Sequence, residues 1–474
     1  MSAALSLRAE APWRVLNSFG EALHSASRWA SPRNLEELTT LLARAREEHL
    51  PISLRGSGRS YGDASLNEGG ISLDLRAMNR MLDWNPVEGI ATVEPGLTIE
   101  GLWRRTLEDG YWPAVVPGTM FPTLGGCAAM NIHGKNNFAV GPFGEHILDL
   151  DLLTADGNLL RCSRTDNPEI FHSVIGGAGL LGVMTRLRIK LKKVESGLLR
   201  VEPIVSHNFD EMVDTFEERL PRSDYLVGWI DCMAEGEGLG RGAIHQANYL
   251  HAEEDTVGPA SLHIERQVLP STILGVPRGQ LWRIMRLFFS NDLGMRFLNF
   301  GKFQSGRLTR KGSTYLQAHV AFAFLLDYVP GWWRAYGPKG LAQIQVFVPA
   351  EAVRTVIPDI LRLCQERDYP SYLGVFKRHR RDEFLLSHAV DGYSLALDFA
   401  IHDRERLDAL AREITARVLD AGGRFYLAKD ALLQAGELAR AYGDRIPRFL
   451  ALKSRLDPAG LWTSDLARRL ALTA

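Results

Sequence analysis

The glycine-rich segment 55–63, with the sequence RGSGRSYGD, constrains the fold more than any other part of the chain. It follows residues 51–54, which are typical of a short strand, and its glycines permit backbone conformations with positive φ. Successive backbone N–H groups in such a loop form a concave anion site, for which a pyrophosphate is a natural guest. A glycine-rich connection that binds nothing is the alternative, because short glycine motifs are common.

The spacing of this loop argues against two common nucleotide-binding folds. Gly56, Gly58 and Gly62 are one residue too widely spaced for a dinucleotide-binding Rossmann turn, and Asn-Glu-Gly-Gly follows where a helix would begin. No Gly-Lys-Ser/Thr follows either, so a Walker-type phosphate loop does not fit.

A second candidate segment spans residues 117–136 and contains Pro-Gly-Thr, Gly-Gly and Ile-His-Gly-Lys-Asn. Paired glycines ahead of small residues let a backbone approach a flat or charged ligand closely. We expect a short helix starting near Gly125, which would aim its first N–H groups at an anion. Taken alone, His133 and Lys135 are more typical of a loop histidine and a solvated lysine than of catalytic residues.

Composition excludes several classes of protein. The 474 residues suggest two domains, and a formal net charge of −1 gives no support to nucleic-acid binding. No apolar stretch reaches the roughly 18 residues of a membrane-spanning helix. The four cysteines contain no CxxC pair, so we expect neither a disulfide framework nor a metal site, and a reducing cytoplasm fits best.

The pattern of helix and strand signals in the sequence changes near residues 195 and 410. Residues 1–195 alternate helix and strand signals, including a helix capped by Asn34. Residues 196–410 contain strand-like segments at 225–232, 343–348 and 394–400, and the stretch 253–305 shows weak periodicity typical of a lid. Residues 411–474 continue an amphipathic helix that leads to Gly422 and Gly423 and a further strand.

In combination, these segments resemble a known family. The loop at 55–63, Pro-Gly-Thr, Gly-Gly, Ile-His-Gly-Lys-Asn, Asp-Leu-Leu-Thr-Ala-Asp-Gly (151–157) and Gly-Leu-Leu-Gly (179–182) occur in the order seen in FAD-binding oxidases of the vanillyl-alcohol oxidase superfamily. Within it, the chain resembles the decaprenylphosphoryl-β-D-ribose 2′-oxidase family. Further matching segments are 333–338, 343–345, 375–377, 426–430 and 464–470.

The resemblance implies an α+β fold with a two-part, PCMH-type FAD-binding domain. Residues 1–195 and 411–474 would build the FAD domain, and residues 196–410 would form an inserted substrate domain on an antiparallel sheet. Relatives that tether FAD covalently carry a histidine where this chain has Arg59, so we expect non-covalent FAD. The implied cofactor-binding residues are Arg55, Gly56, Ser57, Gly58, Arg59, Ser60, Tyr61, Gly62, Pro117, Gly118, Thr119, Thr123, Gly125, Gly126, Cys127, Ile132, His133, Asn136, Gly179, Gly182, Met184, Tyr426 and Lys429.

The resemblance also implies catalytic roles. Lys429 matches the lysine near the flavin and the substrate, where a cation would stabilise the negative charge of reduced flavin. Tyr61 and His133 match positions at the flavin face, and either residue is a candidate to take the proton of the hydroxyl.

The implied substrate-binding residues are Lys135, Trp229, Gln345, Lys377 and Asp398. Lys377 also opens a basic run to Arg381, which fits either a phosphate contact or a solvated loop. Ala396 and Ser394 depart from the mycobacterial members, which have cysteine and asparagine at these two positions.

We therefore expect an FAD-dependent enzyme that oxidises a secondary alcohol of a sugar, with a polyprenyl-phosphate-linked furanose as the candidate substrate. The rivals are an aldonolactone or alditol oxidase of the same superfamily and a non-catalytic flavoprotein. Oxygen or a quinone would be the electron acceptor, and a reductase acting on the keto product is a further candidate partner. Peripheral contact with a membrane would accompany a lipid-linked substrate.

Overall fold

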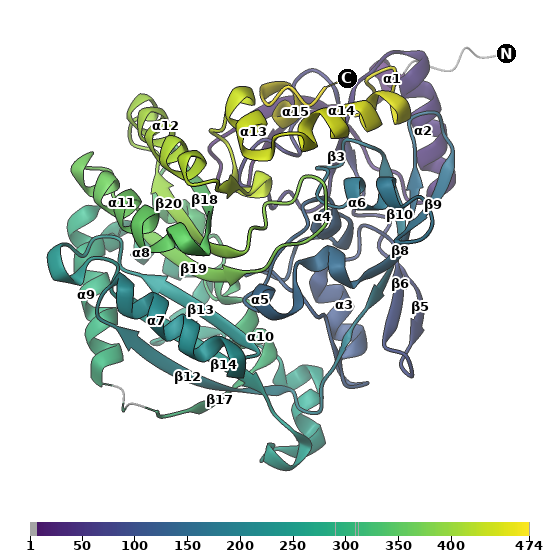
Figure 1. Cartoon of the computed structure of the whole chain (residues 1–474). Helices are drawn as coiled ribbons and strands as arrows, with labels where there is room; N and C mark the ends of the chain where they lie inside the picture. The colour runs from purple at the N-terminus through teal and green to yellow at the C-terminus, as the bar shows by residue number, and fades with distance from the viewer. Residues whose placement is uncertain (1–6, 290, 309, 311, 474) are drawn as a thin grey trace.

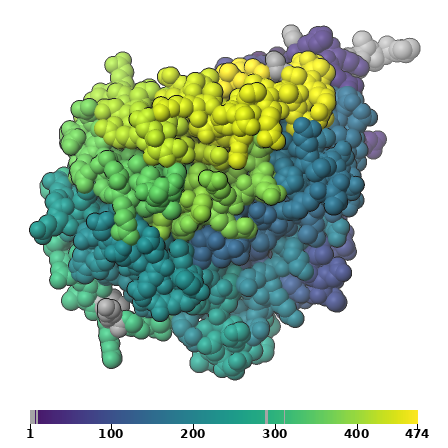
Figure 2. All heavy atoms as spheres, in the orientation of Figure 1, coloured from purple at the N-terminus to yellow at the C-terminus, as the bar shows by residue number. Residues whose placement is uncertain are grey.

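The computed structural model describes residues 7–289, 291–308, 310 and 312–473. In Figure 1 the N-terminal part, in purple and blue, lies beside a large sheet drawn in teal and green. The last helices, in yellow, return to the N-terminal part, and Figure 2 shows the same yellow segment packed against both regions.

The first sheet carries the glycine-rich loop. Its strand order is β1-β2-β4-β3, and β3 runs parallel to β4. Asn34 caps the helix before β3, because its side chain accepts a hydrogen bond from the Glu37 N–H at 2.9 Å. The bounds are β1 (Trp13–Asn17), β2 (His24–Ala30), α2 (Leu35–Glu47), β3 (Ile52–Arg55) and β4 (Ile71–Asp74).

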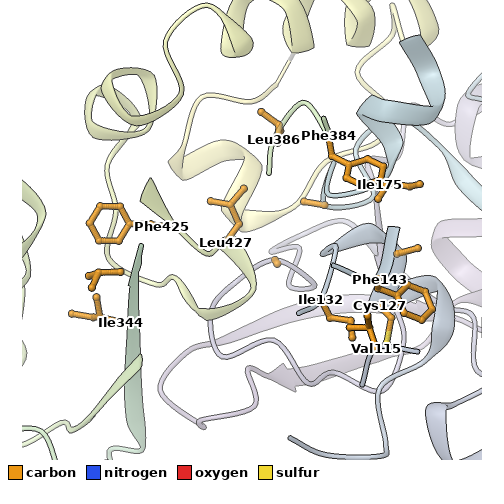
Figure 3. Close-up of a cluster of buried hydrophobic side chains, with 14 of the residues drawn as sticks. Val115, Cys127, Ile132, Phe143, Ile175, Ile344, Phe384, Leu386, Phe425 and Leu427 are labelled. Atoms are coloured by element: carbon orange, nitrogen blue, oxygen red, sulfur yellow. The ribbon is translucent and has the colours of Figure 1, made fainter. Parts of the chain in front are cut away.

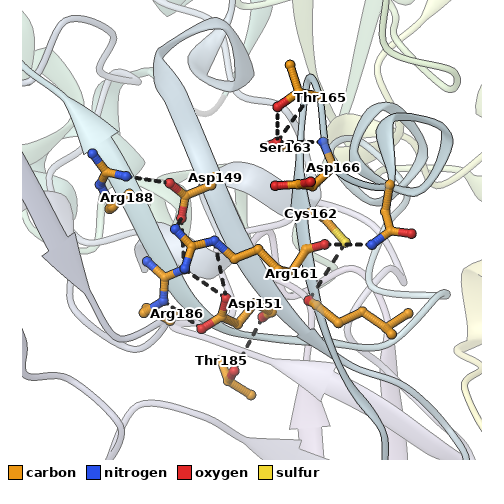
Figure 4. A network of polar contacts seen from close by, with 12 residues as sticks. Asp149, Asp151, Arg161, Cys162, Ser163, Thr165, Asp166, Thr185, Arg186 and Arg188 are labelled. Atoms are coloured by element: carbon orange, nitrogen blue, oxygen red, sulfur yellow. Dashed lines mark hydrogen bonds and ion pairs between the residues drawn. The ribbon is translucent and has the colours of Figure 1, made fainter.

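The second sheet is antiparallel, with the order β5-β6-β10-β8-β9. A cross-strand ion network holds two of its strands in register: Arg186 pairs with Asp149 at 2.8 Å and with Asp151 at 2.6 Å, and Arg188 pairs with Asp149 (Figure 4). The bounds are β5 (Met81–Asn85), β6 (Ile90–Val93), α3 (Ile99–Thr106), β7 (Tyr111–Trp112), α4 (Leu124–Ala129), α5 (Asn137–Val140), β8 (Ile147–Leu153), β9 (Leu159–Ser163), α6 (Pro168–Val174), β10 (Val183–Lys190) and β11 (Lys192–Lys193).

An eight-stranded sheet forms the other half of the molecule, and each neighbouring pair of its strands is antiparallel. Helices α7, α11 and α12 pack on one face and bury apolar side chains such as Phe376 and Leu395. The strands in spatial order are β17 (Tyr315–Ala318), β12 (Leu198–Ser206), β14 (Gly242–Tyr249), β13 (Tyr225–Ile230), β19 (Leu373–His379), β20 (Gly392–Ala400), β18 (Leu341–Pro349) and β21 (Arg424–Phe425); the helices are α7 (Phe209–Arg219), α11 (Val353–Glu366) and α12 (Arg404–Asp420). This arrangement confirms the expected α+β class with a large antiparallel sheet.

The C-terminal segment joins both halves. Ile52 donates to the Leu461 carbonyl and Thr463 donates back to Ile52, so the chain end pairs with β3. The C-terminal segment contains the helices α13 (Ala435–Tyr442), α14 (Arg445–Leu456) and α15 (Asp465–Arg469). Because β21 pairs with β18 of the large sheet, we propose placing the C-terminal domain boundary after Phe425 instead of near residue 410.

The stretch 253–305 contains helices that its weak periodicity did not predict: α8 (Leu281–Phe289) and α9 (Asp292–Leu308). Helix α9 buries Met295, Asn299 and Phe303 at helical spacing, but exposed Leu293 and Phe297 obscure that pattern in the sequence. Within the described ranges, no helix is both long and apolar enough to cross a membrane.

The main hydrophobic core spans both halves. Figure 3 shows Val115, Cys127 and Ile132 on the side of the N-terminal part and Ile344 and Phe425 on the side of the large sheet, all within one buried cluster. Burial across this junction fixes the large sheet against the segment that carries His133.

We expect Lys453→Met to lower the free energy of unfolding by about 3 kcal/mol or more, the cost of breaking a buried ion pair. Lys453 and Asp457 are fully buried and 2.9 Å apart, and Lys453 also donates to the carbonyls of Leu180 and Trp462. The measurement is urea unfolding of the holoenzyme. Arg455→Met on the same helix is the control; its exposed pair should cost less than about 1 kcal/mol, and equal losses would contradict the prediction.

Candidate active site

A cavity lies between the glycine-rich loop and the large sheet. It is lined by most of the residues that the sequence predicts for the cofactor and by Lys377, the predicted substrate residue that reaches it. These lining residues are Arg55, Gly56, Ser57, Gly58, Arg59, Ser60, Tyr61, Pro117, Gly118, Thr119, Thr123, Gly125, Gly126, Ile132, His133, Gly179, Met184, Lys377, Tyr426 and Lys429.

The backbone of the glycine-rich loop is prepared for an anion. The N–H groups of residues 57–60 donate to no other group within the described chain, although they line the cavity. Gly58 has φ +62°, and the Arg55 guanidinium supports the loop through hydrogen bonds to Ser65 Oγ and the Asn17 carbonyl, each 3.0 Å long. Free amides on a fixed, curved backbone suit a pyrophosphate.

Helix α4 does not act as the predicted anion site. Its first three N–H groups are already used: Leu124 donates to the Leu97 carbonyl, Gly125 to the Pro95 carbonyl and Gly126 to Thr123 Oγ1. The glycines serve close packing instead, since a Cβ at Gly125 would lie 2.7 Å from Pro95 Cβ. The sequence identified the segment correctly as part of the cavity wall but misjudged what its amides contact.

Gly62 acts outside the cavity lining, against the segment that carries Lys429. A Cβ at Gly62 would lie 1.7 Å from the Asp430 carbonyl oxygen, and the Tyr61 N–H donates to the Ala428 carbonyl at 2.8 Å. Arg469 reinforces this contact, pairing with Asp63 at 2.7 Å and with Asp430 at 2.9 Å. The two segments are therefore locked together.

Strand register brings the predicted substrate residues onto one face of the large sheet. Trp229 on β13 lies opposite Val375 on β19. Lys377 follows Val375 by two residues on β19 and lies opposite Ser394 on β20. Gln345 lies opposite Ala396, in the same row as the pair formed by Gln343 and Asp398. Because side chains alternate along a strand, these residues share the face opposite to the one covered by helices.

Tyr61, Asp398 and Lys429 form one electrostatic group. Burial raises the pKa of Asp398 to about 6, against a hydrogen bond from Gln343 and the charge of Lys429. Burial lowers the pKa of Lys429 to about 8, and its ammonium lies 5.6 Å from the centre of the Tyr61 ring. Burial and the charge of Asp398 raise the pKa of Tyr61, so its phenol stays protonated at neutral pH.

His133 is buried at the cavity wall within a polar cluster. Its Nε2 lies 3.0 Å from Gln345 Nε2 and 3.3 Å from Gln345 Oε1, and Gln345 donates to Ser394 Oγ at 3.1 Å. His379 Nε2 lies 2.8 Å from the same hydroxyl. Burial and the charge of Lys377 lower the pKa of His133, so the ring is neutral at neutral pH.

Several predicted residues lie away from the cavity lining. Cys127 is buried in the core, the Asn136 amide donates to the Ala114 carbonyl at 2.8 Å, and Gly182 packs against the Leu153 carbonyl. Lys135 is anchored by the Phe322 and Ala323 carbonyls, and Trp229 is covered by Lys302 of α9, 3.9 Å from the ring centre.

The basic run 377–381 does not form one cationic patch. Lys377 faces the cavity, whereas Arg378 pairs with Asp391 and His379 is fully buried. Arg380 lies 4.0 Å from Glu145. Alternation along β19 turns Arg378 to the face opposite to Lys377 and His379, which adjacent letters in the sequence do not reveal.

Comparison with known proteins agrees with this geometry. A family model described as an FAD binding domain matches residues 26–163. Decaprenylphosphoryl-beta-D-ribose oxidase of Mycolicibacterium smegmatis is 31% identical over 471 residues, which cover 96% of this chain and 97% of the relative. The chain belongs to the decaprenylphosphoryl-β-D-ribose oxidase family. An uncharacterised Streptomyces coelicolor protein is 27% identical over 79% of this chain and its own full length, and Cytokinin dehydrogenase 6 of Oryza sativa is 34% identical over 34% of this chain and 32% of its own.

Membership of this family makes the protein an FAD-dependent oxidoreductase that acts on CH–OH groups. The cavity fits the cofactor, because the free amides of the loop and the small residues of the second segment leave room for a pyrophosphate. A Cβ at Gly56 would lie 2.2 Å from Thr123 Oγ1, so glycine is required where these two walls meet.

Sequence reasoning missed functional residues that carry no motif of their own. Phe19 and Leu326 line the cavity from distant segments, and nothing in their local sequence distinguishes them from core residues. His379 and His388, whose rings lie 4.9 Å and 5.3 Å from that of His133, were also missed. The period of two along β19 was the available signal for His379.

We expect Gly62→Ala to separate the Tyr61 and Lys429 segments, because the new methyl group would overlap the Asp430 carbonyl. The variant should bind FAD at least about tenfold more weakly, because overpacking of this kind costs about 1–3 kcal/mol. The measurement is flavin retention during dilution of the purified protein. Gly436→Ala, where nothing lies within 4 Å of the new Cβ, should retain FAD as the parent does.

Proposed function

We propose that this enzyme oxidises a secondary alcohol of a furanose carried on a polyprenyl phosphate. The observation that carries the proposal is the convergence of Trp229, Gln345, Lys377 and Asp398, from four different strands, on the face of the large sheet that overlooks the FAD cavity. A sheet face that carries polar side chains beside the aromatic ring of Trp229 suits a sugar. The near full-length similarity to a decaprenylphosphoryl-ribose oxidase favours the lipid-linked form.

In the proposed reaction, FAD held by the residues of the cavity would supply the acceptor for the hydride of the alcohol carbon. Lys429 lies at the cavity wall, and its ammonium offsets the negative charge that develops there. Because its pKa is lowered to about 8 by burial, Lys429 remains mostly charged at neutral pH.

For the hydroxyl proton, we favour Tyr61 assisted by Asp398, which acts on Tyr61 through its charge and shares with it the hydrogen-bond partner Gln343. Tyr61 lines the cavity and stays protonated, so it takes the substrate proton only as it passes its own on. Asp398, with a pKa near 6, is ionised at neutral pH and suited to receive it. His133 remains the second candidate, but its lowered pKa makes it the weaker base.

We propose that FAD is held without a covalent bond. Arg59 occupies the position where tethered relatives carry histidine, and its guanidinium lies 5.1 Å from the Phe19 ring and 5.0 Å from the Phe121 ring. An aromatic enclosure of this kind fixes a cation in place but offers no nucleophile for attachment to the flavin.

The remaining partners follow from the proposed substrate. Oxygen or a quinone would accept the electrons, and a reductase would act on the keto product. We propose a cytoplasmic enzyme with peripheral membrane contact; the four cysteines are buried and free, and Leu287, Leu293 and Phe297 are exposed on α8 and α9. Ala396 and Ser394 give the sheet face a different surface from the cysteine and asparagine of mycobacterial members.

Two alternative functions use the same cavity or the same cofactor. An aldonolactone or alditol oxidase would use the same cavity, but Arg59 and the Tyr-Leu-Ala-Lys-Asp segment at 426–430 count against it. A non-catalytic flavoprotein would not need Tyr61, Asp398 and Lys429 to be buried together, at the cost that burial imposes on charged groups.

We expect Lys429→Met to retain FAD but to reduce its flavin about a hundredfold more slowly or worse, the scale of losing one charge stabiliser. Anaerobic stopped-flow absorbance with a saturating sugar substrate measures this rate. Lys193→Met, at an exposed site on β11, is the matched control. A near-normal rate in a folded Lys429→Met protein would assign the role to another residue.

The substrate class is tested by anaerobic bleaching of the flavin with a polyprenyl-phosphoryl furanose and with the same sugar lacking phosphate and lipid. We expect the lipid-linked compound to reduce the flavin at much lower concentration. Equal efficiency with the bare sugar or a simple polyol would replace this proposal with a carbohydrate oxidase. If none of these compounds bleaches the flavin, the hypothesis of a non-catalytic flavoprotein is favoured.

A further inference from the structure

The site contains more cations than the flavin chemistry uses. Lys135, Lys302 and Lys377 form no ion pair with any carboxylate in the described part of the chain. Burial lowers the pKa of Lys135 to about 7 and of Lys302 to about 8, and burial with the charges of Lys429 and Lys135 lowers that of Lys377. Asp398 acts on Lys429, at the flavin end.

These cations and His245, whose pKa burial lowers to about 4 so that its ring is neutral at neutral pH, form a row over the polar face of the sheet. Lys377 is within electrostatic range of Lys429 and Lys135, and His245 is within range of Lys135 and Lys302. His245 lies opposite Val227 on the neighbouring strand, and therefore shares its face with Trp229 and Lys377. The row ends where the Lys302 ammonium lies 3.9 Å from the centre of the Trp229 ring.

Helix α9 carries Lys302 and positions its ammonium over the Trp229 ring. Asn299, one turn earlier, donates to Asp231 Oδ1 at 2.9 Å, and Phe303 is buried beside it. Arg296 donates to the Met233 carbonyl at 3.2 Å. The helix is thus anchored on both sides of Lys302, which is exposed on α9 and has its ammonium over the Trp229 ring.

We infer that Lys302, together with Trp229 and His245, forms a receiving site for a phosphate group attached to the substrate. This inference rests on the proposed sugar oxidation and assigns the end of the row at which the Lys302 ammonium lies over Trp229. An ammonium without a carboxylate partner favours a nearby anion, because an opposite charge stabilises its ionised form. A phosphate has several acceptor oxygens and can accept hydrogen bonds from the Lys302 ammonium and from a ring N–H of neutral His245 at once.

The same chemistry is available from a lipid phosphodiester and from a free sugar phosphate. A lipid-linked substrate would continue past Lys302 along α9, where Phe297 and Phe300 are exposed. A free sugar phosphate would end at the row of cations. The test therefore compares three substrates: a polyprenyl-phosphoryl furanose, the furanose 1-phosphate and the bare furanose.

The decisive variant is Lys302→Met, which keeps an apolar stem against Trp229 and removes the charge. We expect the KM for both phosphorylated substrates to rise about tenfold or more, the scale of one hydrogen bond to a charged group. The KM for the bare furanose should change less than about twofold, because this sugar has no phosphate to contact Lys302. The kcat for all three substrates should also change less than about twofold, because the lost contact stabilises the bound substrate and the transition state equally. Lys302→Arg should restore most of the affinity.

Arg307→Met is the matched control, because Arg307 is exposed on the same helix and, among the described residues, hydrogen-bonds to Gln304. Equal KM changes for phosphorylated and bare substrates in Lys302→Met would overturn the inference and make Lys302 an anchor of α9. The same loss in Arg307→Met would overturn it too, as a general effect of charge.

A binding measurement separates this inference from the proposed function. Calorimetric titration of the holoenzyme with pyrophosphate should show binding that Lys302→Met weakens, whether or not any sugar is oxidised. If the parent oxidises no furanose but binds pyrophosphate through Lys302, the proposed function fails and the anion site stands. If the parent oxidises the phosphorylated sugars and Lys302→Met keeps their KM, the anion site fails and the proposed function stands.

Discussion

Arg469 connects the two segments on which the cavity depends. It forms a bidentate pair with Asp63 and a third bond with Asp430, with N···O distances of 2.7–2.9 Å. Asp63 ends the glycine-rich loop, and Asp430 directly follows Lys429. Bidentate guanidinium–carboxylate pairs fix orientation as well as distance, so Arg469 sets how far the loop amides lie from the Lys429 ammonium. Without the arginine, two largely buried carboxylates would face each other unpaired.

The second organising constraint is the alternation of side chains along the large sheet. One face supplies the apolar contacts that hold α7, α11 and α12, and the other supplies Trp229, Lys377 and Asp398. A shift of register by one residue would exchange these faces and destroy packing and site together. The chemistry of the site is therefore protected by the same hydrophobic burial that stabilises the sheet.

The sequence predicted the fold class, and its glycine spacing and local motifs drew attention to the segments that supply most residues of the cavity wall. It misjudged the amides of α4, since internal acceptors such as Pro95 and Leu97 come from another segment. It missed α9, whose exposed apolar residues hide the helical period. The role of Gly62 was also out of reach, because its partner Asp430 is brought close only by tertiary packing.

The late position of Lys429 and Arg469 in the chain sets an order for biosynthesis. The glycine-rich loop leaves the ribosome early, but its free amides face an incomplete wall until residues 428–430 and helix α15 have been made. Translation proceeds at about 5–20 residues per second, so a nascent chain holds this half-built cavity for tens of seconds. Completion of the cavity wall is consequently a late event of synthesis, because Ala428 and Lys429 belong to that wall.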